Sequence, residues 1–244
     1  MHIIKLHTTD STNSALNEAL QKKHLIDGTV LWTEHQRQGR GQAGRSWHSE
    51  LDKSLTFSIL KRFESLKLEH LTFLNMQIAC SLGMFLQHYS TQKIQWKWPN
   101  DILSNEKKIT GILIENSIQS RFVKHSIIGI GINLFPIDYS KLPKATSLFN
   151  DEAKAFDRKA FLEELVHALL TDLNQFEQGD FRRIKENYLQ QLYGFNRLEK
   201  YRITATNEII DARIIDIDEH GRLVVVSKSG KDYAFENRAV ELIY

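Results

Sequence analysis

The residues from Glu34 to Trp47 combine glycine and arginine at a spacing suited to holding an anion. Gly39, Gly41 and Gly44 are interleaved with three arginines. Glycine lets the backbone reach positive φ and brings bare N–H groups close to a ligand. Arginine supplies a permanent forked positive charge that fits carboxylate and phosphate oxygens. The stretch therefore predicts the phosphate-binding loop of a nucleotide-using enzyme, with the tryptophan as a flat face for a base.

Two other kinds of loop share this composition. Gly-Arg runs also occur in disordered RNA-binding tails, where they repeat many times. This run occurs once, between residues 29–35 and 54–61, which both have the pattern of strands. Residues 39–46 approach a P-loop, but that motif needs lysine in place of Arg45 and a helix directly after it. The P-loop is excluded, whereas an RNA contact or a plain basic loop stays open.

Three further stretches, residues 97–101, 108–115 and 129–134, carry features of the same site. Two of them begin with a lysine, and Gly111 and Gly129 lie within strand-like runs. Glycine inside a strand often marks the close approach of a ligand or of another backbone segment. Buried strands with a bulge would explain each stretch taken alone. Together with the loop, they predict a sheet face lined by glycine backbone and by cations.

Ser11, Thr12 and Asn13 precede a run of apolar residues at helical spacing. Such side chains cap helix N-termini. The exposed N–H groups at the start of a helix also bind polar ligands. Both interpretations stay open for these three residues.

Length and composition bound the class of protein. A chain of 244 residues with 41% hydrophobic and 25% charged residues is typical of one large globular domain, or of one domain and a small module. A net charge of +2 is too small for bulk nucleic-acid binding. The single cysteine, Cys80, excludes an internal disulfide and a multi-cysteine zinc site, and no metal centre is expected. No membrane span or signal peptide is predicted, and we expect a cytoplasmic protein.

The hydrophobic periodicity predicts an α+β fold. Successive strands without intervening helices, between residues 94 and 134, indicate a mixed or antiparallel sheet flanked by helices. Helices are expected over residues 12–24, 68–88, 157–178 and 180–192. Strands are expected over residues 3–6, 29–35, 54–61, 94–98, 101–103, 107–118 and 122–134.

The hydrophobic pattern of the sequence changes near Gly194, from helical spacing to short strand-like alternation. Short alternating runs follow, at residues 201–203, 209–217, 223–226, 233–235 and 240–243. They predict a small β-barrel module. We therefore expect one domain over residues 1–193 and a second over residues 194–244.

Four of these stretches, taken together and in order, resemble the biotin protein ligase family. They are Gly39-Arg40-Gly41-x-x-Gly44-Arg45, Lys97-Trp98-Pro99-Asn100-Asp101, Lys108-x-x-Gly111-Ile112-Leu113-Ile114-Glu115 and Gly129-Ile130-Gly131-Ile132-Asn133-Leu134. The Ser11-Thr12-Asn13 run precedes them, as it does in that family. The combination is highly specific and spans nearly the whole chain, although no single piece would be.

The resemblance implies a catalytic domain like that of class II aminoacyl-tRNA synthetases, followed by an SH3-like β-barrel. Many bacterial members begin with a DNA-binding domain. Here the catalytic pattern starts within the first dozen residues, so we expect no such domain, no DNA partner and no repressor activity. A homodimer is compatible with the resemblance but cannot be read from the sequence.

The implied reaction has two steps. Biotin reacts with ATP to give biotinyl-5′-AMP and pyrophosphate, and a lysine of a biotin carboxyl carrier protein then takes the biotinyl group and releases AMP. Positive charge and backbone N–H donors should dominate the first step, because it brings two anions together. Mg²⁺ is expected with ATP, bound mainly by the phosphates.

The resemblance also implies roles for individual residues. The catalytic set is Arg40, Lys108 and Asp101, where Asp101 either steers the incoming lysine amine or contacts magnesium. The biotin-binding set is Ser11, Thr12, Asn13, Gln36, Gly39, Arg40, Lys108, Gly111 and Gly129. The ATP-binding and adenylate-binding set is Arg40, Gly41, Arg45, Trp47, Asn100, Lys108 and Asn133, with Arg45 towards the pyrophosphate and Trp47 near adenine.

The sequence departs from the family pattern at two places. Gln42 stands where the bacterial pattern has a second arginine, so we expect faster leakage of activated biotin than in members that keep the arginine. Residues 236–238, Glu-Asn-Arg, replace the more common Gly-Glu turn of the barrel. That change puts in doubt how the module contacts ATP or the carrier, but not the reaction.

Two rival functions remain. A lipoate or octanoate ligase has a similar fold and also modifies a carrier lysine, but its usual Arg-Arg-x-x-Gly-Gly-Gly run is absent. A non-enzymatic RNA-binding module would need aromatic residues interleaved with basic ones on an exposed face. Trp96 and Trp98 are instead expected inside the sheet.

Overall fold

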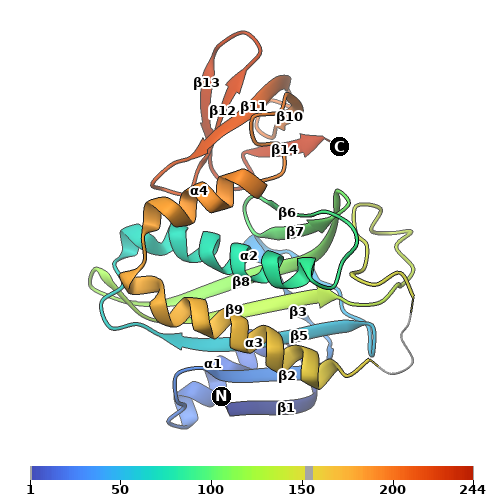
Figure 1. Ribbon diagram of the computed structural model, residues 1–244, viewed down its shortest axis with the longest axis vertical. Coiled ribbons are helices and arrows are strands. Elements are labelled where there is room, and N and C mark those ends of the chain that lie inside the picture. The colour runs from blue at the N-terminus through green and yellow to red at the C-terminus, as the bar shows by residue number, and fades with distance from the viewer. Residues whose placement is uncertain (1, 152–155, 244) are drawn as a thin grey trace.

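The computed structural model describes residues 2–151 and 156–243 (Figure 1). A seven-stranded sheet with strand order β1-β2-β5-β9-β8-β7-β6 forms its centre. The strands are β1 (His2–Thr9), β2 (Thr29–Gln36), β5 (Ser54–Arg62), β6 (Ile94–Lys97), β7 (Asp101–Ser104), β8 (Lys107–Gln119) and β9 (Phe122–Asn133). Strands β1 and β2 are parallel, and the other neighbouring pairs are antiparallel. The predicted α+β class with a mixed sheet is confirmed.

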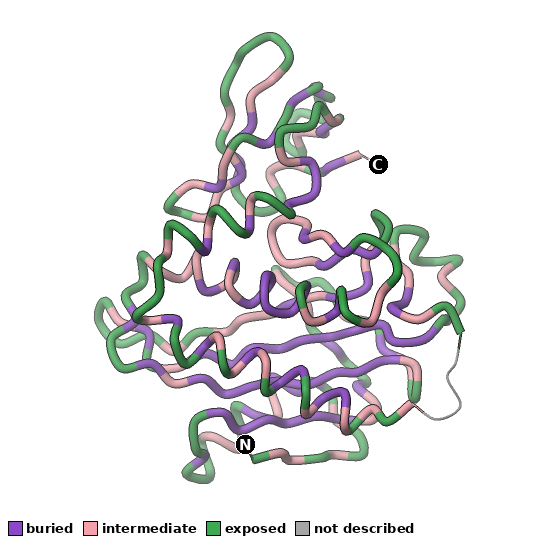
Figure 2. Tube along the Cα trace, in the orientation of Figure 1, coloured by how far each residue is buried: buried purple, intermediate pink, exposed green. Residues whose placement is uncertain are grey.

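Helices cover both faces of this sheet (Figure 1). They are α1 (Thr12–Lys22), α2 (Leu71–Gln87), α3 (Arg158–Gln175) and α4 (Phe181–Gln191). Strand side chains alternate between faces, so Leu31 and Leu60 pack with Leu16 of α1, whereas Val30 and Phe57 belong to the larger cluster on the α2 and α3 side. Strands β5 and β9 lie between the two layers and are buried along most of their length (Figure 2).

A second, five-stranded antiparallel sheet follows α4, with strand order β13-β12-β11-β10-β14. Its strands are β10 (Glu199–Ile203), β11 (Ile209–Ile217), β12 (Leu223–Ser227), β13 (Asp232–Phe235) and β14 (Val240–Ile243). The Trp98 indole N–H donates to the Gly221 carbonyl at 3.0 Å, and Lys185 pairs with Asp216 at 2.7 Å. The first contact joins the second sheet to the end of the first, and the second contact joins it to α4 (Figure 1).

Three details differ from the sequence prediction. The Gly-Arg stretch contains a short hairpin, β3 (Gly39–Arg40) and β4 (Ser46–Trp47), around a 3₁₀ turn at Gln42–Gly44. Further 3₁₀ turns stand at Leu68–His70 and Phe176–Gln178, where α-helix was expected. The placement of Trp98 inside the sheet was wrong: Trp96 is buried, but Trp98 is half-buried and contacts the second sheet.

Cys80 is buried in α2, as its apolar neighbours predict. No helix of residues 2–151 and 156–243 is both long enough and apolar enough to span a bilayer.

Candidate active site

A cavity of about 520 Å³ lies on the α1 side of the central sheet. This volume lies within the range of small-molecule sites. Its walls come from the start of α1, the Gly-Arg loop, the middle of β8 and β9, the turn after β6, and the turn between β13 and β14. Most of the residues predicted from the sequence line it: Ser11, Thr12, Asn13, Gln36, Arg40, Gly41, Arg45, Trp47, Asn100, Asp101, Lys108, Gly111 and Gly129. Gly39 and Asn133 lie outside this lining.

The start of α1 forms one wall of the cavity. Ser11 is the N-cap residue, and its hydroxyl accepts the Ser14 N–H at 3.5 Å. The Thr12 N–H donates to Oε1 of Gln36 at 2.8 Å. The capping interpretation of Ser11 is therefore confirmed. Because the same residues also face the cavity, capping does not exclude a contact with a ligand.

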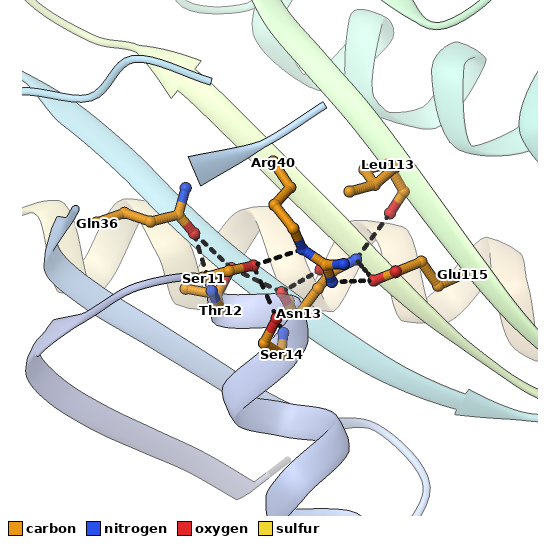
Figure 3. Close-up of polar contacts among 9 residues, drawn as sticks. Ser11, Thr12, Asn13, Ser14, Gln36, Arg40, Leu113 and Glu115 are labelled. Atoms are coloured by element: carbon orange, nitrogen blue, oxygen red, sulfur yellow. Dashed lines mark hydrogen bonds and ion pairs between the residues drawn. The ribbon is translucent and has the colours of Figure 1, made fainter. Parts of the chain in front are cut away.

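Asn13 lies at the centre of a polar network (Figure 3). Its Oδ1 accepts from the Ser58 hydroxyl at 2.6 Å, and its Nδ2 donates to the Glu115 carboxylate at 2.7 Å. The Arg40 guanidinium donates to the same carboxylate at 2.9 Å. Figure 3 shows Arg40 between Ser11 and Glu115. Side chains from α1, β3, β5 and β8 thus hold one another in place beside the cavity.

Glycines in β8 and β9 form the floor. A Cβ atom on Gly129 would lie 2.3 Å from Oδ1 of Asn13, and one on Gly131 would lie 2.3 Å from the Trp47 ring. A Cβ on Gly111 would lie 3.0 Å from the same ring. The close approach that glycine within a strand predicts is therefore made by side chains of this chain. Because the Trp47 ring lies this close to Gly111 and Gly131, larger residues at these two positions would displace it.

Two lysines line the cavity, Lys97 from β6 and Lys108 from β8, the strands on either side of β7. Lys108 pairs with Asp101 at 2.6 Å, and its ammonium lies 5.5 Å from the centroid of the Trp47 ring. Burial lowers the pKa of the Lys97 ammonium; the Asp101 and Glu241 carboxylates oppose this shift, and Arg45 adds to it. The site therefore concentrates positive charge, supplied by Arg40, Arg45, Lys97, Lys108 and Arg238.

Two residues predicted to contact the nucleotide, Asn100 and Asn133, form hydrogen bonds within the protein. Nδ2 of Asn100 donates to the Ile112 carbonyl at 2.7 Å, which joins the turn after β6 to β8. Nδ2 of Asn133 donates to the Thr146 carbonyl at 3.0 Å, outside the cavity lining. A nucleotide contact by either residue stays a prediction.

Several residues of the site carry no assignment from the sequence. Glu115 ends one of the quoted motifs and Lys97 begins another, but neither received a role. Asn237, Arg238 and Glu241 reach the cavity from the second sheet. Nothing local in the sequence signals their position, because it depends on how the two sheets pack.

Metal-binding capacity is low in the described part of the chain. It contains no group of three or more histidine, cysteine or acidic residues placed to share an ion. The acidic residues among those lining the cavity are Asp101 and Glu241, and Asp101 already pairs with Lys108. These residues would hold a nucleotide-bound Mg²⁺ only weakly by themselves.

The model of the Biotin/lipoate A/B protein ligase family matches residues 6–133, more than half of the chain. This chain belongs to that family. It is 29% identical over 234 residues to the biotin–[acetyl-CoA-carboxylase] ligase of Paracoccus denitrificans, covering 93% of this chain and 95% of that one. It is 27% identical over 235 residues to the bifunctional ligase/repressor BirA of Bacillus spizizenii, covering 94% of this chain and 70% of that protein.

The fold is likewise that of a family member. The biotin protein ligase of Aquifex aeolicus in complex with biotin and ATP superposes with a TM-score of 0.76 at 26% identity, covering 99% of this chain and 98% of that one. As a member of this ligase family, the chain is an enzyme. The cavity holds most of the residues whose types led to that expectation from the sequence.

Proposed function

We propose that the chain is an ATP-dependent biotin–protein ligase. It activates biotin as biotinyl-5′-AMP and transfers the biotinyl group to a lysine of a biotin carboxyl carrier protein. The observation that carries the proposal is one cavity lined both by a polar wall, Ser11 to Asn13 with Gln36, and by five cationic side chains. The named relatives, which are biotin ligases, support biotin as the substrate.

In the first step, an oxygen of the biotin carboxylate attacks the α-phosphorus of ATP. The bond to the bridging oxygen breaks, and pyrophosphate leaves with the electron pair. Both reactants are anions, so their approach is unfavourable without fixed positive charge. In this proposal Arg40 and Lys108 would neutralise the carboxylate and the α-phosphate, and Arg45 would hold the pyrophosphate. Ser11, Thr12 and Gln36 would hydrogen-bond the ring system of biotin.

In the second step, the ε-amine of a carrier lysine attacks the carbonyl carbon of the adenylate. The carbon–oxygen bond to AMP breaks, an amide forms, and the amine loses a proton. Asp101, the first residue of β7, lines the cavity and would attract the incoming ammonium group. Its 2.6 Å pair with Lys108 adds another role, because the carboxylate also fixes the position of that lysine.

Mg²⁺ would accompany ATP and be held mainly by the phosphates. Asp101, whose carboxylate pairs with Lys108 in the cavity, would be its contact on the protein. When bound, the ion would offset phosphate charge. This expectation rests on the chemistry of ATP and on the few carboxylates in the cavity.

Further parts of the proposal concern architecture and location. We propose that residues 1–193 form a catalytic domain like that of class II aminoacyl-tRNA synthetases. The second sheet would belong to an SH3-like domain that begins at residue 194. We also propose a homodimer, for which the outer edge of β1, unpaired among the described residues, offers a pairing surface. Sedimentation velocity measures this last point. A cytoplasmic location is an expectation of the same kind.

The test is ATP-dependent transfer of biotin to a purified biotin carboxyl carrier domain. The wild type and a Lys107→Ala control should label the carrier, because Lys107 is exposed and does not line the cavity. Lys108→Ala should label it about 10²–10³-fold more slowly, the loss typical of removing one group that stabilises transition-state charge. A wild type that leaves biotin unused but transfers lipoate would keep the family and overturn the substrate.

A further inference from the structure

The turn between β13 and β14 reaches across to the Gly-Arg loop. Nδ2 of Asn237 donates to Oε1 of Gln42 at 2.9 Å, and the Arg238 guanidinium donates to the Ala43 carbonyl. Each pair of residues is 195 positions apart in the chain, and the two turns belong to different sheets. The second sheet therefore makes two direct hydrogen bonds to the tip of the loop.

The tip of the loop has little else to hold it. Ala43 has a φ of 53°, in the left-handed region that is unfavourable for a residue with a side chain. A Cβ atom on the neighbouring Gly44 would meet nothing within 4 Å. Such backbone conformations persist where surrounding contacts hold them. Within the loop the supporting bonds are those from the Gly41 N–H to Arg45 and from the Arg45 N–H to Gln42.

The two places where the sequence departs from the family pattern thus meet in space. Gln42 is neutral where the pattern has an arginine, and Asn237-Arg238 belongs to the altered turn of the second sheet. The amide of Gln42 accepts a hydrogen bond that a guanidinium at this position could not accept, because arginine has no acceptor atom. Arg238 itself lines the cavity together with Arg45 and Lys97.

We infer that Asn237 and Arg238 form a latch that holds residues 42–44 over the cavity before any substrate binds. On the proposed function, the latch slows the escape of biotinyl-5′-AMP, and Arg238 returns to the rim of the site a positive charge that Gln42 does not supply. Asn237 acts through the loop, and Arg238 acts through the loop and through its charge at the rim; neither is assigned a contact with the reacting atoms, so both are positioning residues and not catalytic ones.

Hydrogen exchange of the peptide covering residues 37–47, in the absence of substrates, tests the latch independently of ligase activity. Exchange should rise about thirtyfold in the Asn237→Ala/Arg238→Ala variant, the factor expected when two ordinary hydrogen bonds are lost. Exchange in β9 should not change, which shows that the fold is intact. Lys228→Ala, at an exposed lysine in the turn between β12 and β13, is the matched control and should behave as the wild type.

A double-mutant cycle separates the two contacts. Gln42→Ala and Asn237→Ala should be non-additive in loop exchange, because each removes the same hydrogen bond. Arg238→Lys should restore part of the protection, since an ammonium can also donate to the Ala43 carbonyl. A loop that exchanges freely in the wild type, or equally in all variants, would overturn the latch whether or not the protein transfers biotin.

The second readout is the rate at which preformed biotinyl-5′-AMP leaves the enzyme. We expect release to be several-fold faster in the double variant, since open loops retain ligands poorly. Loop exchange that rises without faster release would overturn the retention role. A wild type that forms no adenylate would overturn the proposed function and leave the exchange result to decide the latch.

Discussion

The guanidinium of Arg40 and the carboxylate of Glu115 pair at 2.9 Å although 75 positions separate them in the chain. The same carboxylate accepts from Asn13, so one acid orients two residues of the predicted biotin site. Arg40 is thereby held beside the cavity by an anion of the protein itself. The substrate carboxylate would meet an arginine that is already positioned, and this pre-organisation lowers the cost of binding.

Glu115→Ala should therefore impair biotin use more than stability. Side-chain exposures of 47% for Arg40 and 41% for Glu115 mean that solvent screens the pair, so the change in unfolding free energy should stay below about 1 kcal/mol. Loss of the oriented arginine should lower kcat/KM for biotin about tenfold, equivalent to one ordinary charged hydrogen bond. Steady-state pyrophosphate release measures this, with thermal unfolding as the control. Unchanged kinetics would show that Glu115 does not position Arg40.

Asp101→Asn distinguishes the roles considered for this carboxylate. If Asp101 positions Lys108, adenylate formation should slow about tenfold, after allowance for screening of a partly exposed pair. We expect this result because the two side chains lie 2.6 Å apart. Single-turnover pyrophosphate release and carrier labelling separate the steps. Normal pyrophosphate release with slow labelling would instead assign Asp101 to the carrier lysine alone.

Gly129→Ala should disturb the polar network beneath the cavity. The new Cβ would lie 2.3 Å from Oδ1 of Asn13, whose amide is held on both sides by Ser58 and Glu115. Overpacking of this kind costs about 1–3 kcal/mol, measurable by urea denaturation. Adding Asn13→Ala should relieve the clash and recover stability, while biotin affinity stays low. A single variant as stable as the wild type would contradict the tight approach.

Cys80 should be unreactive in the folded protein. Burial raises the pKa of its thiol to about 12, and the nearby Asp172 carboxylate adds to the shift. The thiolate is the reactive form, so at pH 8 far less of it is present than for a free cysteine of pKa about 8.5. Alkylation at pH 8 should be slow in buffer and fast in denaturant. Because the pKa is higher in the folded state, the contribution of the thiol to folding stability is fully present below the unfolded pKa of about 8.5. It is lost as the pH rises from there towards about 12.

Local patterns in the sequence predicted most of the fold and much of the site. Helices and strands came within a few residues of their observed ends, because side-chain periodicity records which face of each element is buried. The glycines and cations that line the cavity could also be identified, since residue type alone determines what each can contribute to a binding site. The resemblance ordered them into one site.

The contacts between distant segments could not be predicted in this way. Neither the pairing of Arg40 with Glu115 nor the approach of Asn237 to Gln42 follows from a local pattern, because both depend on how strands and sheets are placed in space. Residue type also did not reveal that the Asn133 amide donates to the Thr146 carbonyl, and its contact with a nucleotide stays a prediction.

Gln42→Arg tests charge and geometry at the same position. The arginine should prolong the lifetime of bound biotinyl-5′-AMP, because it adds a cation close to Arg45. It should also break the hydrogen bond from Asn237, since a guanidinium cannot accept one. The two effects oppose each other in the wild-type background. In an Asn237→Ala background the hydrogen bond is already absent, so only the charge effect remains and the gain in lifetime should be larger. Adenylate release followed by quench-flow compares the two backgrounds. Equal lifetimes with and without the arginine in both backgrounds would show that charge at residue 42 does not govern retention.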